Sequence, residues 1–268
     1  MGYLNTFCFQ WIRRRHGPDL RPRGLQSGYD VTTVEQARKW LDGASRIAAL
    51  TGAGVSAESG IPTFRGAGGL WRQFRPEDLA TPEAFARDPL LVWEWYDWRR
   101  RLIAAASPNP GHAALAEIER RAGAFALITQ NVDGLHERAG SRCVLKLHGD
   151  IWQVRCTGCG AEKRDDRTPL PSLPPRCECG SLLRPGVVWF GEPLPAGIWA
   201  QAEQAASGAE VFLVIGTSAA VYPAAGLAWL AKSAGAKVIE INPEETGLSA
   251  AADVSLRGKS GDLLPLLI

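Results

Sequence analysis

Short, continuous apolar runs alternate with segments of helical periodicity along the chain. The apolar runs span residues 45–51, 125–129, 143–149, 186–190, 210–216 and 237–242. Helical patterns lie between them, at residues 34–42, 89–106, 112–121, 198–206 and 223–233. Continuous apolar strands are typical of a parallel sheet that is buried on both faces. The pattern therefore predicts a doubly wound, Rossmann-type α/β fold with ligands at the carboxyl ends of its strands.

Two segments interrupt this alternation. Residues 70–106 are helical and tryptophan-rich, and they do not fit a plain Rossmann scheme. Residues 151–185 are rich in Cys, Pro and Arg and lack a helical period, so we expect a small inserted module there. The predicted organisation is a basic N-terminal arm at 1–30, a large domain formed by 31–150 and 186–268, and the module at 151–185. Residues 70–106 are assigned to the large domain as a helical insertion.

Composition and charge exclude several classes of protein. The chain is 46% apolar and 22% charged with a net charge of +2, which is ordinary for a soluble globular protein and requires neither nucleic acid nor a membrane as partner. In the N-terminal arm the apolar stretch precedes the arginines, the reverse of a secretory signal. Gly2 and Thr6 fit a myristoylation pattern that is short enough to occur by chance. We expect a poorly ordered arm and a cytoplasmic protein of undetermined oligomeric state.

Four cysteines form the strongest local pattern. Cys156 and Cys159 are separated by two residues, and Cys177 and Cys179 by one. Two close thiolate pairs match a tetrahedral zinc site with a closed sulfur shell, which leaves no position for a reactive water. We therefore predict one structural zinc ion, bound by Cys156, Cys159, Cys177 and Cys179. A nucleic-acid-binding ribbon is disfavoured because the module's charges are mixed.

The stretch "GAGVSAESGIPTFRG" begins like a dinucleotide-binding loop. Gly52, Gly54 and Ala57 satisfy G-x-G-x-x-[G/A] directly after an apolar run, which predicts a phosphate-binding turn. A hydride-transferring dehydrogenase should continue with a helix, a second strand and an acidic ribose ligand. Here glycines and Pro62 break that helix. This reading of the chain as an oxidoreductase is therefore disfavoured.

Polar side chains follow two of the predicted strands. Gln130, Asn131 and Asp133 come after the run at 125–129, and His148 ends the run at 143–149. Because the carboxyl ends of parallel strands share one edge of the sheet, we expect these side chains near the glycine loop. An imidazole with a pKa near 6.5 can accept a proton from a sugar hydroxyl at neutral pH. His148 is therefore the candidate general base, whereas His16, His112 and His136 have no comparable sequence setting.

Taken together, several motifs resemble one family. "GAGVSAESGIPTFRG", "TQNVDGLHERAG", "LKLHGD", the four cysteines, "GTS" and "INPEE" are similar, in this order, to those of the sirtuins, the NAD-dependent protein-lysine deacylases. The resemblance runs from about residue 44 to 264. It implies that NAD and an acyl-lysine peptide meet in a cleft between a Rossmann-type domain and a zinc-binding domain. It also implies that NAD is a co-substrate whose glycosidic bond is broken, with His148, Asn131 and Asp133 as catalytic residues.

The resemblance further implies the contacts with both substrates. The NAD-binding residues would be Gly52, Ala53, Gly54, Ala57, Thr63, Phe64, Arg65, Trp71, Gln130, Asn131, Val132, Asp133, Gly216, Thr217, Ser218, Asn242, Pro243, Glu244 and Ser260. The family often has Cys near the last position, so Ser260 departs from its pattern. The peptide backbone would pair with a strand formed by Val187, Val188, Trp189, Phe190, Gly191 and Glu192. The products would be nicotinamide, free lysine and O-acyl-ADP-ribose.

One spacing bears on the acyl group. Tyr96 and Arg99 lie three residues apart on a predicted helix and so share one face. The run Arg99 to Arg101 could simply be solvated, but Tyr-x-x-Arg resembles the sirtuin subgroup that removes succinyl, malonyl and glutaryl groups. Ala80 resembles the small residue that widens the acyl pocket there. We therefore expect a desuccinylase or demalonylase that also deacetylates, and protein mono-ADP-ribosylation is the alternative activity.

Overall fold

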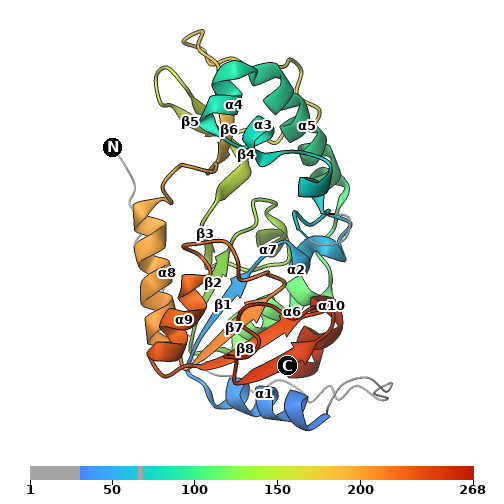
Figure 1. Cartoon of the computed structure of the whole chain (residues 1–268), viewed down its shortest axis with the longest axis vertical. Helices are drawn as coiled ribbons and strands as arrows, with labels where there is room; N and C mark the ends of the chain where they lie inside the picture. Colours follow the sequence, from blue (N-terminus) through green and yellow to red (C-terminus); the bar gives the residue numbers. More distant parts are fainter. Residues whose placement is uncertain (1–30, 66–68) are drawn as a thin grey trace.

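Two β-sheets organise the described part of the chain, residues 31–65 and 69–268 of a computed structural model. A large sheet with its helices forms one lobe, and a small sheet with further helices forms the other (Figure 1). The predicted N-terminal arm lies outside the described residues. Among the residues that the structure describes, no helix is both long and apolar enough to cross a bilayer.

The large sheet has six parallel strands in the order β3-β2-β1-β7-β8-β9. Numbered along this sheet alone, the order is 3-2-1-4-5-6, that of a dinucleotide-binding Rossmann fold, so the predicted fold class is confirmed. The strands are β1 (Arg46–Thr51), β2 (Ala124–Thr129), β3 (Val144–Lys146), β7 (Val211–Ile215), β8 (Lys237–Asn242) and β9 (Val254–Arg257).

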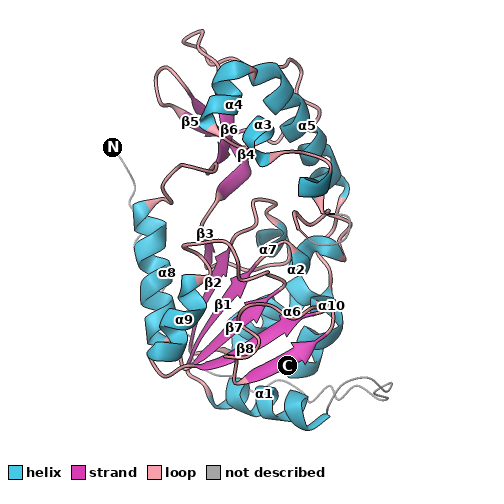
Figure 2. Cartoon of the chain, viewed as in Figure 1, coloured by secondary structure: helices cyan, strands magenta, loops and turns pink. Residues whose placement is uncertain are grey.

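Helices cover both faces of the large sheet (Figure 2). In β1, Ile47 and Ala49 pack on one face while Ala48 and Leu50 pack on the other. This two-sided burial is the reason for the continuous apolar runs. One face is covered by α1 (Val31–Gly43), α6 (Pro110–Arg121), α10 (Ser260–Leu263) and η2 (Leu264–Leu267). The other face is covered by α8 (Ala196–Gly208) and α9 (Gly226–Ser233).

The small sheet is antiparallel, in the order β5-β4-β6. Its strands are β4 (Gly149–Cys156), β5 (Glu162–Arg164) and β6 (Leu183–Val187). The expectation that residues 186–190 form a strand of the parallel sheet is wrong. Only Gly186 and Val187 of that run are in a strand, and Val187 pairs with Gly149 of β4. Strand β6 therefore crosses the boundary that was predicted, between residues 185 and 186, to separate the small module from the large domain.

The helical insertion packs against this small sheet. It contains η1 (Leu70–Arg72), α3 (Pro76–Leu79), α4 (Pro82–Arg87) and α5 (Pro89–Ala105). On α5, the indole nitrogen of Trp93 donates to the carbonyl of Leu183 at 2.7 Å, and the fully buried Arg100 donates to the carbonyl of Ile151 at 3.2 Å. These bonds satisfy buried polar groups on both partners. The insertion and the four-cysteine module thus share one core, although the insertion was expected to belong to the large domain.

Candidate active site

A cavity of about 1030 Å³ lies between the two domains. It is lined by every residue predicted to be catalytic or to bind NAD or substrate, with Trp71 set aside. For Trp71, only its backbone position in η1 is described. The volume is at the upper end of the range for small-molecule sites, roughly 300–1,000 Å³, and so suits a dinucleotide together with an acyl chain.

The glycine loop closes the cavity at the point where the strand order reverses. It follows β1 and leads into the short helix α2 (Gly54–Ala57), and the amide of Gly54 donates to the carbonyl of Gly216 at 2.8 Å. A Cβ on Gly54 would lie 2.7 Å from backbone atoms of Gly216, and Gly216 itself has a φ of +57°. The loops after β1 and β7 can therefore meet only without side chains, which leaves their backbone facing the place of a dinucleotide's phosphates.

Asn131 and Asp133 are held by Ser56, a residue that the sequence analysis did not single out. The Ser56 hydroxyl donates to Oδ2 of Asp133 at 2.8 Å and accepts from Nδ2 of Asn131 at 3.2 Å. Asp133 also accepts from the amide of Leu135 at 2.9 Å, at the start of α7 (Leu135–Arg138). Both side chains are more than nine-tenths buried. They are therefore fixed in place without a ligand.

His148 has its tautomer fixed by the backbone. Its Nδ1 lies 3.0 Å from the carbonyl oxygen of Gln130, and because a carbonyl can only accept, Nδ1 carries the proton. Nε2 is then the acceptor nitrogen. Burial is the largest effect and lowers the pKa of His148 below its ordinary value. The bond to the Gln130 carbonyl acts in the opposite direction but is smaller. The imidazole is therefore neutral at pH 7, as a general base must be.

Two further histidines, His112 and His136, lie buried behind Ser56 and, unlike His148, do not line the cavity. His112 Nε2 is 3.4 Å from the Ser56 hydroxyl, and the rings of His112 and His136 are 4.9 Å apart. Desolvation lowers the pKa of His112 to about 4 and that of His136 well below 6.5. The spacing Asn109-x-x-His112 carries a signal, because the pair forms the capping box of α6.

The end of the cavity away from the small domain is lined by the loops after β7, β8 and β9. Asn242 Nδ2 donates to the carbonyl of Thr217 at 2.8 Å, and Gln130 Nε2 donates to the hydroxyl of Thr217 at 3.0 Å. Ser260 Oγ donates to Glu58 at 3.3 Å. The structure thus brings Ser260 to the same cavity as the glycine loop, at the end away from the small domain.

Tyr96 and Arg99 form the wall that α5 contributes. Their side chains are buried, with 3% and 8% of their surfaces exposed. The Arg99 guanidinium stacks over the ring of Phe64 and over that of Trp95, each at 4.9 Å from the centroid. No ion pair of Arg99 occurs within residues 31–65 and 69–268. The neighbouring arginines therefore have different environments. The Arg101 side chain is 57% exposed and pairs with Asp97, whereas Arg99 lines the cavity.

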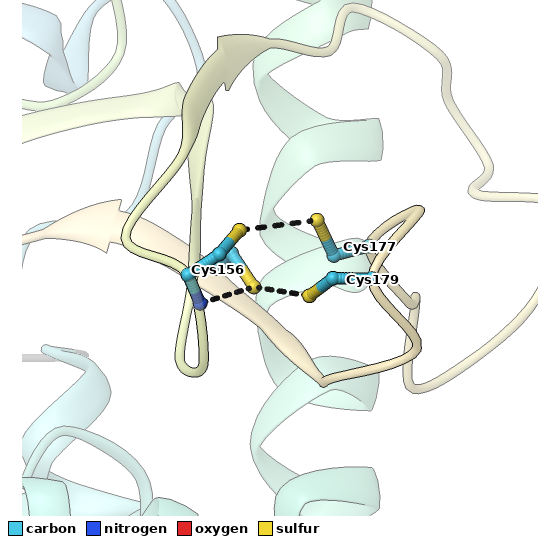
Figure 3. Close-up of side chains that lie close together, drawn as sticks. Cys156, Cys177 and Cys179 are labelled. Atoms are coloured by element: carbon cyan, nitrogen blue, oxygen red, sulfur yellow. Dashed lines mark hydrogen bonds between the residues drawn. The ribbon is translucent and has the colours of Figure 1, made fainter.

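The four cysteines converge at the tip of the small domain. Cys156 ends β4 and Cys159 follows it, whereas Cys177 and Cys179 precede β6. The side chains of Cys156, Cys177 and Cys179 point toward one another in Figure 3. The sulfurs of Cys156 and Cys179 are 3.4 Å apart, those of Cys159 and Cys177 are 3.8 Å apart, and all four lie within 4.8 Å of one another. Tetrahedral zinc with Zn–S bonds of ~2.3 Å needs sulfurs ~3.8 Å apart. The cluster therefore fits one structural zinc ion.

Fold and site together define an α/β enzyme with a dinucleotide site at its sheet edge and a zinc-stabilised second domain. Comparison with known proteins gives the family. Residues 52–223 match the model of the Sir2 family. The chain belongs to the Sir2 family, and the resemblance to sirtuins is confirmed.

Relatives with similar sequences carry consistent names. A protein of Aquifex aeolicus named NAD-dependent protein deacylase is 60% identical over 80% of this chain and 90% of its own length. NAD-dependent protein deacylase 2 of Pyrobaculum aerophilum is 57% identical over 82% of this chain and 88% of its own length. The prediction that the chain is an NAD-dependent protein deacylase is therefore confirmed as a class of enzyme.

Solved structures agree. A Sir2 homolog–NAD complex superposes with a TM-score of 0.82 at 53% identity, covering 87% of this chain and 92% of the other. A Sir2 protein bound to a myristoylated histone peptide gives a TM-score of 0.72 at 36% identity, covering 88% and 94%. One of these solved relatives therefore binds NAD, and the other binds an acylated peptide.

Proposed function

We propose that this chain removes acidic acyl groups, succinyl and malonyl, from protein lysines, and acetyl groups as well. The observation that carries the proposal is the buried Arg99 guanidinium on the cavity wall, three residues from the Tyr96 hydroxyl on the same helix. A buried cation without an ionic partner is costly, so a site of this kind favours a ligand that brings a carboxylate. Ala80, which is small, follows α3 and is buried in the lining of the same cavity, leaves room for it.

The NAD chemistry that the family implies supplies an electrophilic ribose carbon. The acyl oxygen bonds to C1′ while the C1′–N bond breaks and nicotinamide leaves. His148 Nε2 then takes a proton from the ribose hydroxyls, so that the 2′-oxygen can attack the acyl carbon. After addition of water, free lysine and O-acyl-ADP-ribose are released. Asn131 and Asp133, held by Ser56, would orient the nicotinamide and its ribose.

The peptide backbone would bind along residues 187–192, but not at every amide. The amide of Val188 already donates to the carbonyl of His148 at 2.9 Å, and that of Phe190 donates to the carbonyl of Ala80 at 3.0 Å. These bonds tie the segment to the active site and to the acyl pocket. The amides of Trp189 and Glu192 are also bonded within the segment, to the Glu192 carboxylate and to the Trp189 carbonyl. A substrate strand would therefore pair with this segment mainly through its carbonyl groups.

The test is Arg99→Met, assayed on matched succinyl-lysine and acetyl-lysine peptides. A charge-assisted hydrogen bond contributes about 1.5–3 kcal/mol, so kcat/KM for the succinyl peptide should fall about 10–100-fold. The acetyl peptide offers no carboxylate and should be affected much less. Arg101→Met is the matched control, because Arg101 is exposed on the same helix, and it should leave the ratio unchanged. Equal losses on both peptides in Arg99→Met would contradict the proposal.

A further inference from the structure

The indole of Trp189 is hydrogen-bonded to Tyr96. Trp189 is 3% exposed, and its Nε1 donates to the phenol oxygen of Tyr96 at 3.0 Å. The two residues are far apart in sequence, since Tyr96 lies on α5 and Trp189 follows β6. Both side chains line the cavity between the domains. The bond therefore joins the acyl-reading helix to the segment proposed to bind the peptide.

This bond determines how the Tyr96 hydroxyl can act. A phenol has one proton to donate and lone pairs with which to accept. Because Trp189 donates to the oxygen, the phenol's own proton must point to another acceptor. Burial, the largest cause, raises the pKa of Tyr96 to about 12, so the phenol stays protonated throughout the neutral range. Tyr96 is thus a hydrogen-bond donor toward the cavity.

Trp189 is itself held by an ion pair. The Arg184 guanidinium lies 3.5 Å from the centroid of the Trp189 ring, and Phe85 packs against that ring with centroids 5.4 Å apart. Glu192 accepts from both terminal nitrogens of Arg184, at 2.5 and 2.8 Å, and from the amide of Trp189 at 2.8 Å. The indole therefore has little freedom to turn away from Tyr96.

We propose that Trp189 is a positioning residue for acyl selection, whose N–H sets the Tyr96 hydroxyl to donate to the terminal carboxylate of an acidic acyl group. The proposal rests on the acyl preference proposed above. The ion pair between Arg184 and Glu192 holds the indole, and Glu192 belongs to the segment along which the peptide would lie. Peptide binding and acyl recognition thus share one hydrogen-bonded unit.

Trp189→Phe tests this role, because it keeps an aromatic ring between Arg184 and Phe85 but removes the N–H. The expected result is a 3–10-fold fall in the ratio of kcat/KM for succinyl-lysine over acetyl-lysine, about 0.7–1.4 kcal/mol at ~1.4 kcal/mol per factor of ten. The loss should appear mainly in KM for the succinyl peptide. Trp93→Phe is the matched control, since it also removes an indole bond of the small domain, to Leu183, and should leave the ratio unchanged.

A double-mutant cycle with Tyr96→Phe separates positioning from packing. If Trp189 acts through the phenol, adding Trp189→Phe to Tyr96→Phe should produce no further change in the ratio. Independent effects of the two substitutions on the ratio would contradict the inference. So would equal losses on both peptides in Trp189→Phe alone, because loss of packing weakens binding of either acyl group.

The two proposals fail in distinguishable ways. If Arg99→Met and Tyr96→Phe leave the succinyl-to-acetyl ratio unchanged, the proposed acyl preference is wrong and the role of Trp189 falls with it. If both change the ratio while Trp189→Phe does not, the acyl preference stands and the positioning role alone is wrong.

Discussion

At the scale of single residues, the proposed reaction depends on which nitrogen of His148 is free to accept a proton. The carbonyl of Gln130 fixes the proton on Nδ1, and burial lowers the pKa of the imidazole. His148→Ala should therefore abolish deacylation, by at least about 100-fold from the usual contribution of a general base. It should leave NAD binding within about threefold, because the glycine loop is unchanged. Isothermal titration with NAD, beside an acyl-peptide assay, measures both, and turnover like that of the wild type would contradict the role.

The same residue sets the expected pH profile. Only the neutral imidazole is a base, so kcat/KM should be constant above the lowered pKa and fall as the pH drops through it. The acid limb should therefore lie below pH 6.5, the ordinary value for histidine. An acid limb above pH 7 on a non-titrating peptide would mean that another group is the base.

The sequence predicted the position of a residue, though not its role, where the residue lies at the end of a strand or in a motif. Gln130, Asn131, Asp133 and His148 all line the cavity, as their positions after strands predict. Their partners were missed because nothing in a linear pattern joins Ser56 to Asp133, or Tyr96 to Trp189. Such contacts arise only when separate elements pack together.

At the scale of elements, β1, β2, β3, β7 and β8 of the large sheet could be predicted from their apolar runs, whereas β9 and the strands of the small sheet could not. The strand β9 has only alternating burial, and β6 contains Pro185, so neither shows a continuous apolar run. The insertion is readable as helices, but its docking onto the small sheet depends on the bonds of Trp93 and Arg100 to the distant backbone. The hydrophobic periodicity of a helix does not show which distant backbone groups its side chains will bond.

The four-cysteine cluster is the element that should stabilise the small domain. All four sulfurs lie within 4.8 Å of one another, as a shared metal ion requires. We expect one zinc per chain. Cys177→Ala should remove it and cost at least about 3 kcal/mol, which lowers the melting temperature by roughly 6–12 °C. Elemental analysis and calorimetry measure both, and unchanged zinc content or stability would contradict the site.

At the scale of the whole molecule, the cavity between the domains explains why a dinucleotide fold carries a second domain. The Rossmann-type sheet carries the glycine loop and His148, whereas α5 and the segment after β6 line the other side of the cavity, where the acyl group and the peptide are proposed to bind. Neither domain alone surrounds both substrates.

The most direct test of this account follows the products from NAD labelled in its adenine ring, with succinyl-lysine and acetyl-lysine peptides supplied in turn. The account predicts that nicotinamide, free lysine and labelled O-acyl-ADP-ribose form in equal amounts, and faster with the succinyl peptide. Label that stays covalently on protein would indicate ADP-ribosyl transfer instead. No peptide-dependent release of nicotinamide would contradict the central claim.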